Sequence, residues 1–229
     1  MKICVVIPIY NEARHIDEVV SAVRHKDLDV VVVNDGSTDG GEEKARQAGA
    51  RILMNAQREG KGGSLQRGFE LIVSEGYDGV ITMDGDGQHD PQDLDHFIKV
   101  IQEHPAAIVT ANRMTNVRNM PWIRRMTNRW MSLMISFICG QTIPDTQCGF
   151  RYIPRDVLTH LDLTARTFEI ETEVLIKASR LGCRIHSVPI QTIYRNEDSK
   201  INPLKDTLRF IVYLVKEMIG RRKSRKFSS

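Results

Sequence analysis

Two aspartates one residue apart, Asp84 and Asp86, lie in the segment TMDGDGQHDP at residues 82–91. Two carboxylates at this spacing can bind a hard divalent cation and leave positions open for water and phosphate oxygens. Without a cation, the two negative charges repel each other, which raises the pKa of one carboxyl group. Aspartate and glycine are also common in ordinary turns, so the pair alone is weak evidence for a metal site.

Buried strands are predicted before this segment and before two other polar loops. The runs ICVVIPI, DVVVVND and GVITM are apolar without alternation, as expected of strands that are covered on both faces of a parallel sheet. Helical spacing or helix-starting residues follow each run. This alternation predicts an α/β fold with a mainly parallel, twisted, Rossmann-like sheet that is flanked by helices.

In such folds, ligands bind in the crevice at the C-terminal ends of the strands. Three loops should therefore meet there. They carry Tyr10 and Glu12 after the first strand, Asp35 after the second, and Asp84 and Asp86 after the fourth. Their convergence would convert a weak aspartate pair into a charged binding site.

Composition bounds the class of protein. The chain has 229 residues, 41% of them hydrophobic, which suits one α/β domain. Four scattered cysteines without a CxxC pair indicate reduced thiols and a cytoplasmic setting. No apolar run reaches the roughly 18 residues needed to cross a bilayer, so we expect any membrane contact to be peripheral.

Residues 113–144 differ in character from the rest of the chain. They contain no Asp, Glu or Lys, but five arginines, five methionines and both tryptophans. Five arginines without carboxylates repel one another unless an anion lies near them. We therefore expect an amphipathic helix beside an acidic ligand.

Three smaller features predict local structure. Asp39 is a candidate N-cap for a helix that Gly49 ends. Pro189 predicts an edge strand or a bulge. Glu169 and Glu171, two residues apart on a helix, cannot share one face, so at most one should point into the cleft.

Six motifs together resemble family-2 glycosyltransferases of the GT-A fold. VVIPIYNE, VVNDGSTDG, GKGGSLQRGF, MDGDGQHDP, DTQCGFRYI and YRNEDSK occur in the order and at about the spacing of that family. The resemblance is closest to the dolichol- or polyprenyl-phosphate mannosyltransferase and glucosyltransferase branch. It implies a GT-A domain at residues 1–200, followed at residues 201–229 by a C-terminal amphipathic helix and a basic tail.

The resemblance also implies residue roles on the donor side. Gly85 replaces the commoner alanine, which we expect to be harmless. Lys61 is expected to reach the diphosphate, although EGKGGS lacks the Gly-Lys-Ser/Thr ending of a P-loop. Asp84, Asp86 and Gln88 correspond to positions that bind Mg²⁺ or Mn²⁺. The implied nucleotide-sugar-binding residues are Pro8, Tyr10, Glu12, Val33, Asp35, Lys61, Asp84, Gly85 and Asp86.

On the acceptor side, the resemblance implies a phosphate-binding set of basic and polar residues. An ionised lipid phosphate needs positioning rather than a strong base, which makes arginines the relevant catalysts. Asp145 corresponds to a proposed acceptor base, and it could act as a base or orient an arginine. The predicted catalytic residues are Asp86, Asp145 and Arg113. The acceptor-phosphate residues are Arg113, Arg124, Asn128, Arg195 and Lys200.

The predicted function is metal-dependent, inverting transfer of a hexose from GDP-mannose or a UDP-sugar to a polyprenyl or dolichyl phosphate. The alternatives are a saccharide or other hydroxyl acceptor, which would require a base such as Asp145, and a non-catalytic module that binds nucleotide sugars. The basic tail RRKSRKFSS lacks interleaved aromatics, so no nucleic-acid partner is expected.

The predicted location is cytoplasmic and peripheral, at an anionic membrane on its inner face, with a membrane protein as a further candidate partner. Aromatic and methionine side chains interleaved with arginines suit the interface of a bilayer. They are Trp122, Met126, Trp130, Met131 and Phe137, with Arg124, Arg125 and Arg129. The helix at 204–219 and the basic tail could add a second signal, or the helix could pack on the core.

Overall fold

The computed structural model describes residues 1–89, 92–117, 120–191 and 213–214. The chain divides into a unit of residues 1–195 and a second unit of residues 196–229. The predicted C-terminal helix and basic tail, together with Arg195 and Lys200, therefore fall almost entirely outside the described residues.

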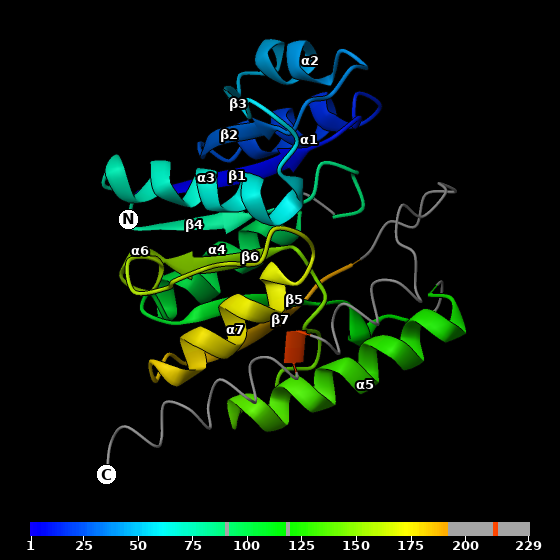
Figure 1. Ribbon diagram of the computed structural model, residues 1–229, viewed down its shortest axis with the longest axis vertical. Helices are drawn as coiled ribbons and strands as arrows, with labels where there is room; N and C mark the ends of the chain where they lie inside the picture. Colours follow the sequence, from blue (N-terminus) through cyan, green and yellow to red (C-terminus); the bar gives the residue numbers. More distant parts are fainter. Residues whose placement is uncertain (90–91, 118–119, 192–212, 215–229) are drawn as a thin grey trace. The chain divides into compact units, whose positions relative to one another are not determined.

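One mixed sheet organises the first unit (Figure 1). In the described part of the chain its strands are β1 (Ile3–Ile9), β2 (Asp29–Asn34), β3 (Arg51–Met54), β4 (Gly79–Thr82), β5 (Ile108–Asn112), β6 (Arg151–Pro154) and β7 (Ile185–Pro189). Their order is β3-β2-β1-β4-β6-β5-β7. β6 runs antiparallel to β4 and β5, and the other pairs are parallel. The mainly parallel sheet predicted from the alternating pattern is confirmed.

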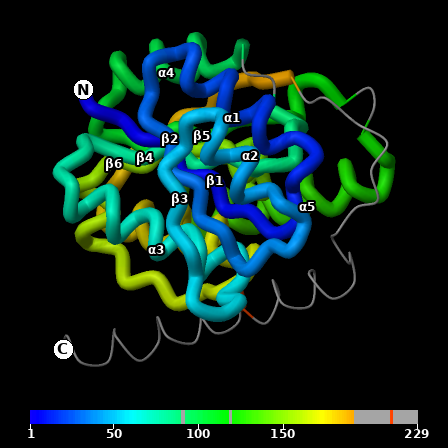
Figure 2. The backbone as a smooth tube through the Cα atoms, turned by 90° about the horizontal axis from the view of Figure 1, so that it is seen from above, coloured from blue at the N-terminus to red at the C-terminus, as the bar shows by residue number. Residues whose placement is uncertain are grey.

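Helices cover the sheet on both faces. They are α1 (Ile16–Arg24), α2 (Gly41–Gln47), α3 (Gly60–Ser74), α4 (Asp93–Glu103), α5 (Trp122–Cys139), α6 (Arg155–Leu158) and α7 (Ile170–Arg180), with a short 3-10 turn, η1 (Arg113–Thr115). Figure 2 shows α3 and α4 on opposite sides of the strands.

β1 is an interior strand of the sheet, and its packing explains why its apolar run is uninterrupted. Ile7 belongs to the buried cluster that contains Val20 of α1 and Phe97 of α4. On the other face, Val6 lies so close to Gly68 of α3 that a β-carbon there would come within 2.5 Å of Val6 Cγ1. Both faces of the strand are therefore buried, and alternation with polar residues is excluded.

The strand register brings the polar loops to one edge. Ile9 of β1 pairs with Asn34 of β2, so these two strands end at the same level. β4 is parallel to β1 and pairs Thr82 with Val6. The loops after β1, β2 and β4 therefore leave the same edge of the sheet, as the sequence predicted.

Two local predictions have different outcomes. β7 is the last strand in the sheet order, so Pro189 lies on an edge strand, where its missing N–H is tolerated. The prediction of Asp39 as N-cap of α2 is wrong by one residue. Gly40, at φ 80°, takes that position, and Asp39 accepts hydrogen bonds from the N–H groups of Gly41 and Ala13.

Candidate functional site

The two motif aspartates follow β4 and have different electrostatic environments. Burial alone would raise the pKa of Asp84, but the neighbouring ammonium of Lys61 lowers it to about 2. Burial and the charge of Asp84 both raise the pKa of Asp86 above its usual value. Asp86 is therefore a partly exposed carboxylate whose charge the protein leaves poorly compensated.

This arrangement fits a divalent cation that is shared with a substrate. Within the described ranges, no three His, Cys, Asp or Glu side chains converge as a complete metal site. Mg²⁺ in particular is commonly held by one or two carboxylates together with substrate phosphates, and it prefers oxygen ligands. Asp84, Asp86 and Gln88 supply oxygens of that kind, and Asp86 accepts a hydrogen bond from the main-chain N–H of Gln88.

Lys61 connects the acidic motif to α7. Its Nζ lies 2.5 Å from Oδ1 of Asp84 and 2.6 Å from Oε1 of Glu171. Burial alone would lower the pKa of Lys61, but the two carboxylates raise it well above its usual range, so the side chain is an ammonium. Of the two glutamates considered from the sequence, Glu171 takes this position, and Glu169 accepts a hydrogen bond from Thr167 instead.

The glycines around Lys61 serve chain packing. The N–H groups of Gly62 and Gly63 donate to the carbonyl of Arg166, at 2.9 and 3.3 Å. A β-carbon on Gly62 would lie 2.4 Å from the carbonyl oxygen of Ala165. The close backbone approach that glycine permits is therefore used by residues 165–166, rather than by a phosphate group as in a P-loop.

Asp35 completes the start of α3. Its Oδ1 accepts from the N–H of Glu59 at 2.7 Å and from Nδ2 of Asn55 at 2.8 Å, and its Oδ2 accepts from the N–H of Gly60 at 2.9 Å. The side chain is buried. Four main-chain N–H groups around the start of α3 thus have partners within the protein, supplied by Asp35 and Arg166.

The other predicted nucleotide-binding residues lie on β1, on β2 and in the loop after β1. Tyr10 is partly exposed, and the Arg58 guanidinium lies over its ring at 3.8 Å from the centroid. Val33 is fully buried in β2, so its side chain contributes to the core. Pro8 and Glu12 are partly exposed, and the buried Gly85 lies beside Ile9.

A second cluster pairs Arg113 with Asp145. The Nε of Arg113 donates to Oδ2 of Asp145 at 2.8 Å, a terminal nitrogen donates to Oδ1 at 3.0 Å, and the Arg113 N–H adds a third bond at 3.1 Å. Gln147 N–H also donates to Oδ1. Burial would raise the pKa of Asp145, but Arg113 lowers it below its usual value. The charge of Arg113 also acts on Asp84, which links the two clusters.

Of the remaining acceptor-side residues, two lie on α5 and two lie outside the described residues. Arg124 and Asn128 lie one turn apart on α5, Asn128 buried and Arg124 partly exposed. Ser132, one turn further, accepts from the N–H of Thr146, beside Asp145. Arg195 and Lys200 lie outside the described residues.

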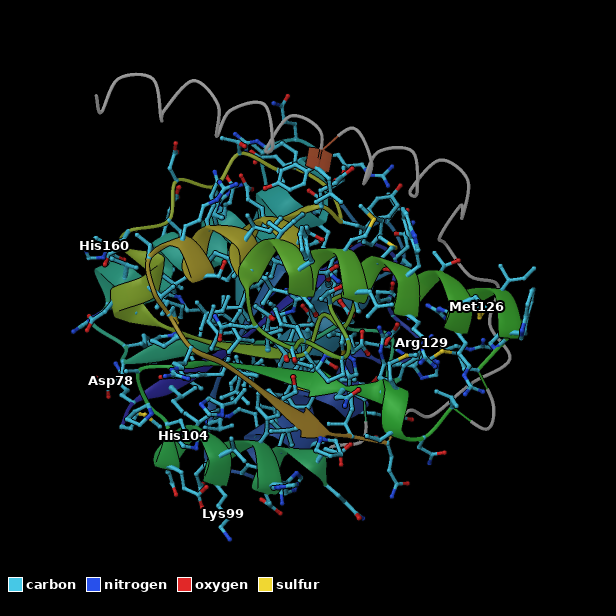
Figure 3. The ribbon with its side chains drawn as sticks, turned by 90° about the horizontal axis from the view of Figure 1, so that it is seen from below. Asp78, Lys99, His104, Met126, Arg129 and His160 are labelled. Carbon is cyan, nitrogen blue, oxygen red and sulfur yellow. The ribbon has the colours of Figure 1, made fainter. Side chains whose placement is uncertain are left out.

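α5 has one buried face and one exposed apolar face. Trp122, Met126, Trp130, Leu133 and Phe137, here named the α5 stripe, recur every three or four residues and are 46–89% exposed. Met131, predicted among the membrane-facing residues, is buried, because it lies on the core face with Ile135. Figure 3 shows Met126 and Arg129 near one end of α5, on the opposite side of the view from Asp78 and His160.

Arg151 supports the site and was not predicted from the sequence. It is 2% exposed and donates hydrogen bonds to the carbonyls of Cys148, Thr146 and Glu171. Its position in DTQCGFRYI gave only a strand pattern, which does not reveal a buried arginine. The same holds for Gly149, which packs against Asp84.

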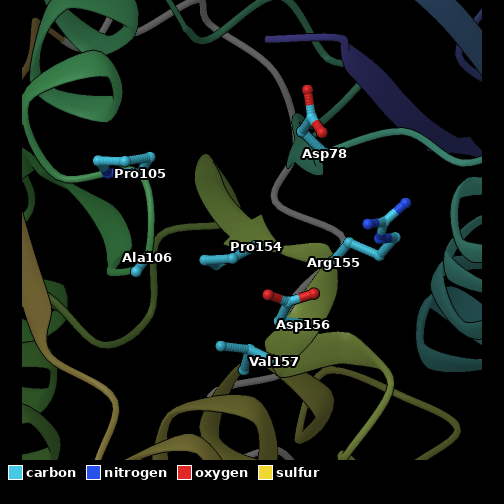
Figure 4. A pocket seen from close by; sticks show the side chains of 7 residues that line it. All are labelled: Asp78, Pro105, Ala106, Pro154, Arg155, Asp156 and Val157. Carbon is cyan, nitrogen blue, oxygen red and sulfur yellow. The ribbon is translucent and has the colours of Figure 1, made fainter.

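A separate hollow lies at the opposite edge of the sheet (Figure 4). It is lined by Asp78, Pro105, Ala106, Pro154, Arg155, Asp156 and Val157. These residues lie at the N-terminal end of β4 and the C-terminal end of β6, away from the loops that carry the acidic motif. The hollow is therefore not part of the candidate site.

Comparisons with known proteins agree on one family and one fold. The family described as "Glycosyl transferase family 2" matches residues 4–162. A UDP-N-acetylglucosamine–dolichyl-phosphate N-acetylglucosaminyltransferase of Methanococcus voltae is 30% identical over 215 residues, which are 84% of this chain and 86% of the relative. An undecaprenyl-phosphate mannosyltransferase of Micrococcus luteus is 28% identical over 208 residues, 85% of each chain.

A solved structure is similar in fold. Glucosyl-3-phosphoglycerate synthase from Mycobacterium tuberculosis, in complex with Mn²⁺, uridine diphosphate and phosphoglyceric acid, superposes with a TM-score of 0.73 and 21% identity. The match covers 96% of this chain and 78% of that one.

Proposed function

The chain belongs to glycosyl transferase family 2, and we propose that this glycosyltransferase moves a hexose from a nucleoside-diphosphate sugar to a polyprenyl or dolichyl phosphate at a membrane surface. The names of two relatives specify a lipid phosphate acceptor. They differ in the sugar, N-acetylglucosamine in one and mannose in the other, so the donor remains either GDP-mannose or a UDP-sugar.

The observation that carries the acceptor assignment is the Arg113–Asp145 pair. A hydroxyl acceptor needs a general base, and a carboxylate suited to that role has a pKa near the working pH. Asp145 is instead fully buried, accepts four hydrogen bonds and has a lowered pKa. It is built to orient Arg113, and an oriented guanidinium suits a phosphate that is already ionised.

On the donor side, Asp84, Asp86 and Gln88 would hold Mg²⁺ or Mn²⁺. When bound, the ion neutralises the charge that builds up on the leaving diphosphate. The similar solved structure contains Mn²⁺, which supports the assignment of a divalent ion. Lys61 adds a positive charge beside Asp84.

The nucleotide is assigned to the loops after β1 and β2. The Tyr10 ring offers a stacking surface and already holds the Arg58 guanidinium in that manner. We assign Glu12 to contact with the ribose, and Pro8 to the same side of the nucleotide pocket. For Asp35 and Val33, burial leaves an indirect or main-chain role, in which they fix the shape of the pocket.

A lipid acceptor requires contact with a membrane, and we assign that contact to the α5 stripe. Its side chains are large, apolar and exposed, and Arg124, Arg125 and Arg129 lie between them. Aromatic rings favour the headgroup region, and arginines are attracted to anionic lipids. In the described part of the chain no helix is long and apolar enough to cross a bilayer, so α5 would lie on the surface.

The deciding experiment compares acceptors. Purified protein is incubated with Mn²⁺, a panel of labelled GDP- and UDP-sugars, and either a polyprenyl phosphate or the matching polyprenol, and labelled lipid is measured after extraction. We expect product with the phosphate and none with the alcohol. Transfer to the alcohol or to a saccharide, without transfer to the phosphate, would overturn the proposal.

Asp145→Asn tests the same point in the protein. If Asp145 only orients Arg113, the change should lower kcat modestly, about tenfold, and leave the pH profile unchanged. If it were the base, the loss should be in the range of about 10²–10⁴-fold. Glu43→Gln, on the exposed face of α2, serves as the control of equal chemical change.

A further inference from the structure

Lys61 is shared between two carboxylates from different parts of the fold. Asp84 follows β4, and Glu171 lies in the first turn of α7. The Nζ lies within 2.6 Å of both, and the three side chains are 15%, 28% and 8% exposed. A buried lysine stays charged only when it is paired in this way.

The charges around Lys61 do not balance. Asp84, Asp86 and Glu171 are three carboxylates in one region, and Lys61 contacts two of them. Arg113 and the imidazole of His89 also act on Asp84, but the hydrogen bonds of Arg113 go to Asp145, and burial lowers the pKa of His89. The three carboxylates therefore carry more negative charge than the Lys61 ammonium neutralises, and they could accommodate a divalent cation.

We propose that Lys61 is a resident counter-cation, which a divalent ion displaces from Asp84, and that Glu171 is the positioning residue that retains it. This inference rests on the proposed function for the presence of the ion. On the same Oδ1 of Asp84, an ammonium and a divalent cation would lie only about 4 Å apart, where their positive charges repel each other. Binding of the ion is thus coupled to a movement of Lys61.

Packing decides which partner moves. A β-carbon on Gly149 would lie 2.6 Å from Oδ2 of Asp84 and 2.9 Å from both its Oδ1 and Lys61 Nζ, so both charged groups pack against the main chain there. The Asp84 carboxylate has only one methylene group between it and its own main chain, whereas the Lys61 ammonium has four. The main chain on both sides of Lys61 is held by Asp35 and the Arg166 carbonyl. The flexible part of the pair is therefore the methylene stem of Lys61.

Glu171 is suited to retain the displaced ammonium. Its carbonyl accepts a hydrogen bond from the buried Arg151, which fixes the first turn of α7. Its carboxylate already contacts Lys61 before any ion binds. Once released from Asp84, the ammonium keeps one carboxylate partner and gains a free N–H for the donor diphosphate.

In the competing interpretation, Lys61 and Glu171 affect the affinity for the ion only through the electrostatic field of their charges. In that case the ion binds Asp86 and the other oxygen of Asp84, Lys61 stays where it is, and each charge changes ion affinity independently. Both interpretations predict tighter Mn²⁺ binding when Lys61 is neutralised. They differ in whether Glu171 acts through Lys61.

A double-mutant cycle on Mn²⁺ affinity separates them. Mn²⁺ binding to the full chain without donor is measured by electron paramagnetic resonance for wild type, Lys61→Met, Glu171→Gln and the double variant. We expect K61M to tighten binding about tenfold and E171Q to weaken it about tenfold, because E171Q strengthens the hold of Asp84 on Lys61. In the K61M background, E171Q should change affinity by less than about twofold.

Equal weakening by E171Q in both backgrounds would overturn the inference. Lys26→Met, which breaks the Lys26–Asp95 ion pair, is the matched control and should leave Mn²⁺ affinity unchanged. If K61M melts below the assay temperature, Lys61→Gln replaces it in the cycle. A wild-type chain that binds no Mn²⁺ even with a nucleoside diphosphate present would instead contradict the metal dependence of the proposed function.

Discussion

At the scale of single residues, Gly149 packs directly against the charged groups of the site. Its missing side chain leaves room for the carboxylate of Asp84 and for the ammonium of Lys61, which a β-carbon would approach within 2.9 Å. Before any ion binds, the two charged groups hold each other in this space. A glycine is therefore required here by space and not by backbone conformation.

Gly149→Ala should disrupt the Asp84–Lys61 pair. We expect donor and Mn²⁺ binding, measured by calorimetry, to weaken at least about tenfold, with a loss of about 1–3 kcal/mol in the free energy of unfolding from overpacking. Gly85→Ala is the control within the motif, since its β-carbon would meet the Ile9 methyl group at 3.0 Å. That contact can relax, so we expect near-normal binding. Equal behaviour of the two variants would contradict the assignment.

The sequence identified single residues better than it identified their partners. Motif order alone pointed to Lys61, Asp84, Arg113 and Asp145. Their pairing was not predictable, because Lys61 and Glu171 are 110 positions apart and meet only through tertiary packing. Periodicity tells which face of an element is buried, but not which charged groups meet there.

At the scale of elements, the start of α3 depends on a turn that α7 holds in place. The carboxylate of Glu173 accepts from the N–H groups of Thr164 and Ala165 and from the Thr164 hydroxyl. This places residues 165–166 against the glycines of α3. Glu173 is thus a structural support for Lys61.

Glu173→Gln should reduce stability in a pH-dependent manner. Burial alone would raise the pKa of Glu173, but Lys177 and the turn amides lower it below its ordinary value of 4.5. A lowered pKa in the folded state stabilises above the unfolded pKa, and this contribution is lost as pH falls through the folded pKa. Urea unfolding should show a deficit of about 1–3 kcal/mol at neutral pH.

The deficit should shrink below about pH 4, where wild-type Glu173 also begins to lose its charge. Glu43→Gln, at a 60% exposed side chain on α2, should differ from wild type by less than about 0.5 kcal/mol at any pH. A deficit that is constant from neutral to acidic pH would rule out the charge of Glu173 as its cause.

The sequence predicted the elements well and one strand direction poorly. Uninterrupted apolar runs predicted β1, β2 and β4, because strands covered on both faces leave no room for polar residues. The same pattern could not reveal that β6 enters antiparallel between β4 and β5. Strand direction depends on where the chain returns after α5, and no local residue pattern records that.

At the scale of the whole molecule, α5 joins two predicted surfaces. Its buried face carries Asn128 and Ser132, and Ser132 contacts Thr146 beside Asp145. Its other face carries the α5 stripe. A lipid acceptor engaged by the stripe would have its phosphate delivered next to the helix that supports the Arg113–Asp145 pair.

The double substitution Trp122→Ser with Phe137→Ser should weaken vesicle binding. Burying one large apolar side chain contributes about 1.5–3 kcal/mol, so a loss of at least about tenfold is expected in sedimentation with vesicles containing anionic lipid. Leu181→Ser, at a 54% exposed leucine outside the stripe, is the control and should bind normally. Full binding by the double variant would remove α5 from the membrane contact.

The capping of α3 has a consequence for the energetics of bond cleavage. Many phosphate-handling proteins stabilise a departing anion with the positive end of a helix dipole. At the start of α3, four main-chain N–H groups already donate hydrogen bonds to the Asp35 carboxylate and the Arg166 carbonyl. Few N–H groups at this helix end therefore remain to stabilise a departing anion. Leaving-group stabilisation must then come from mobile charges, and a chelator should abolish turnover rather than merely slow it.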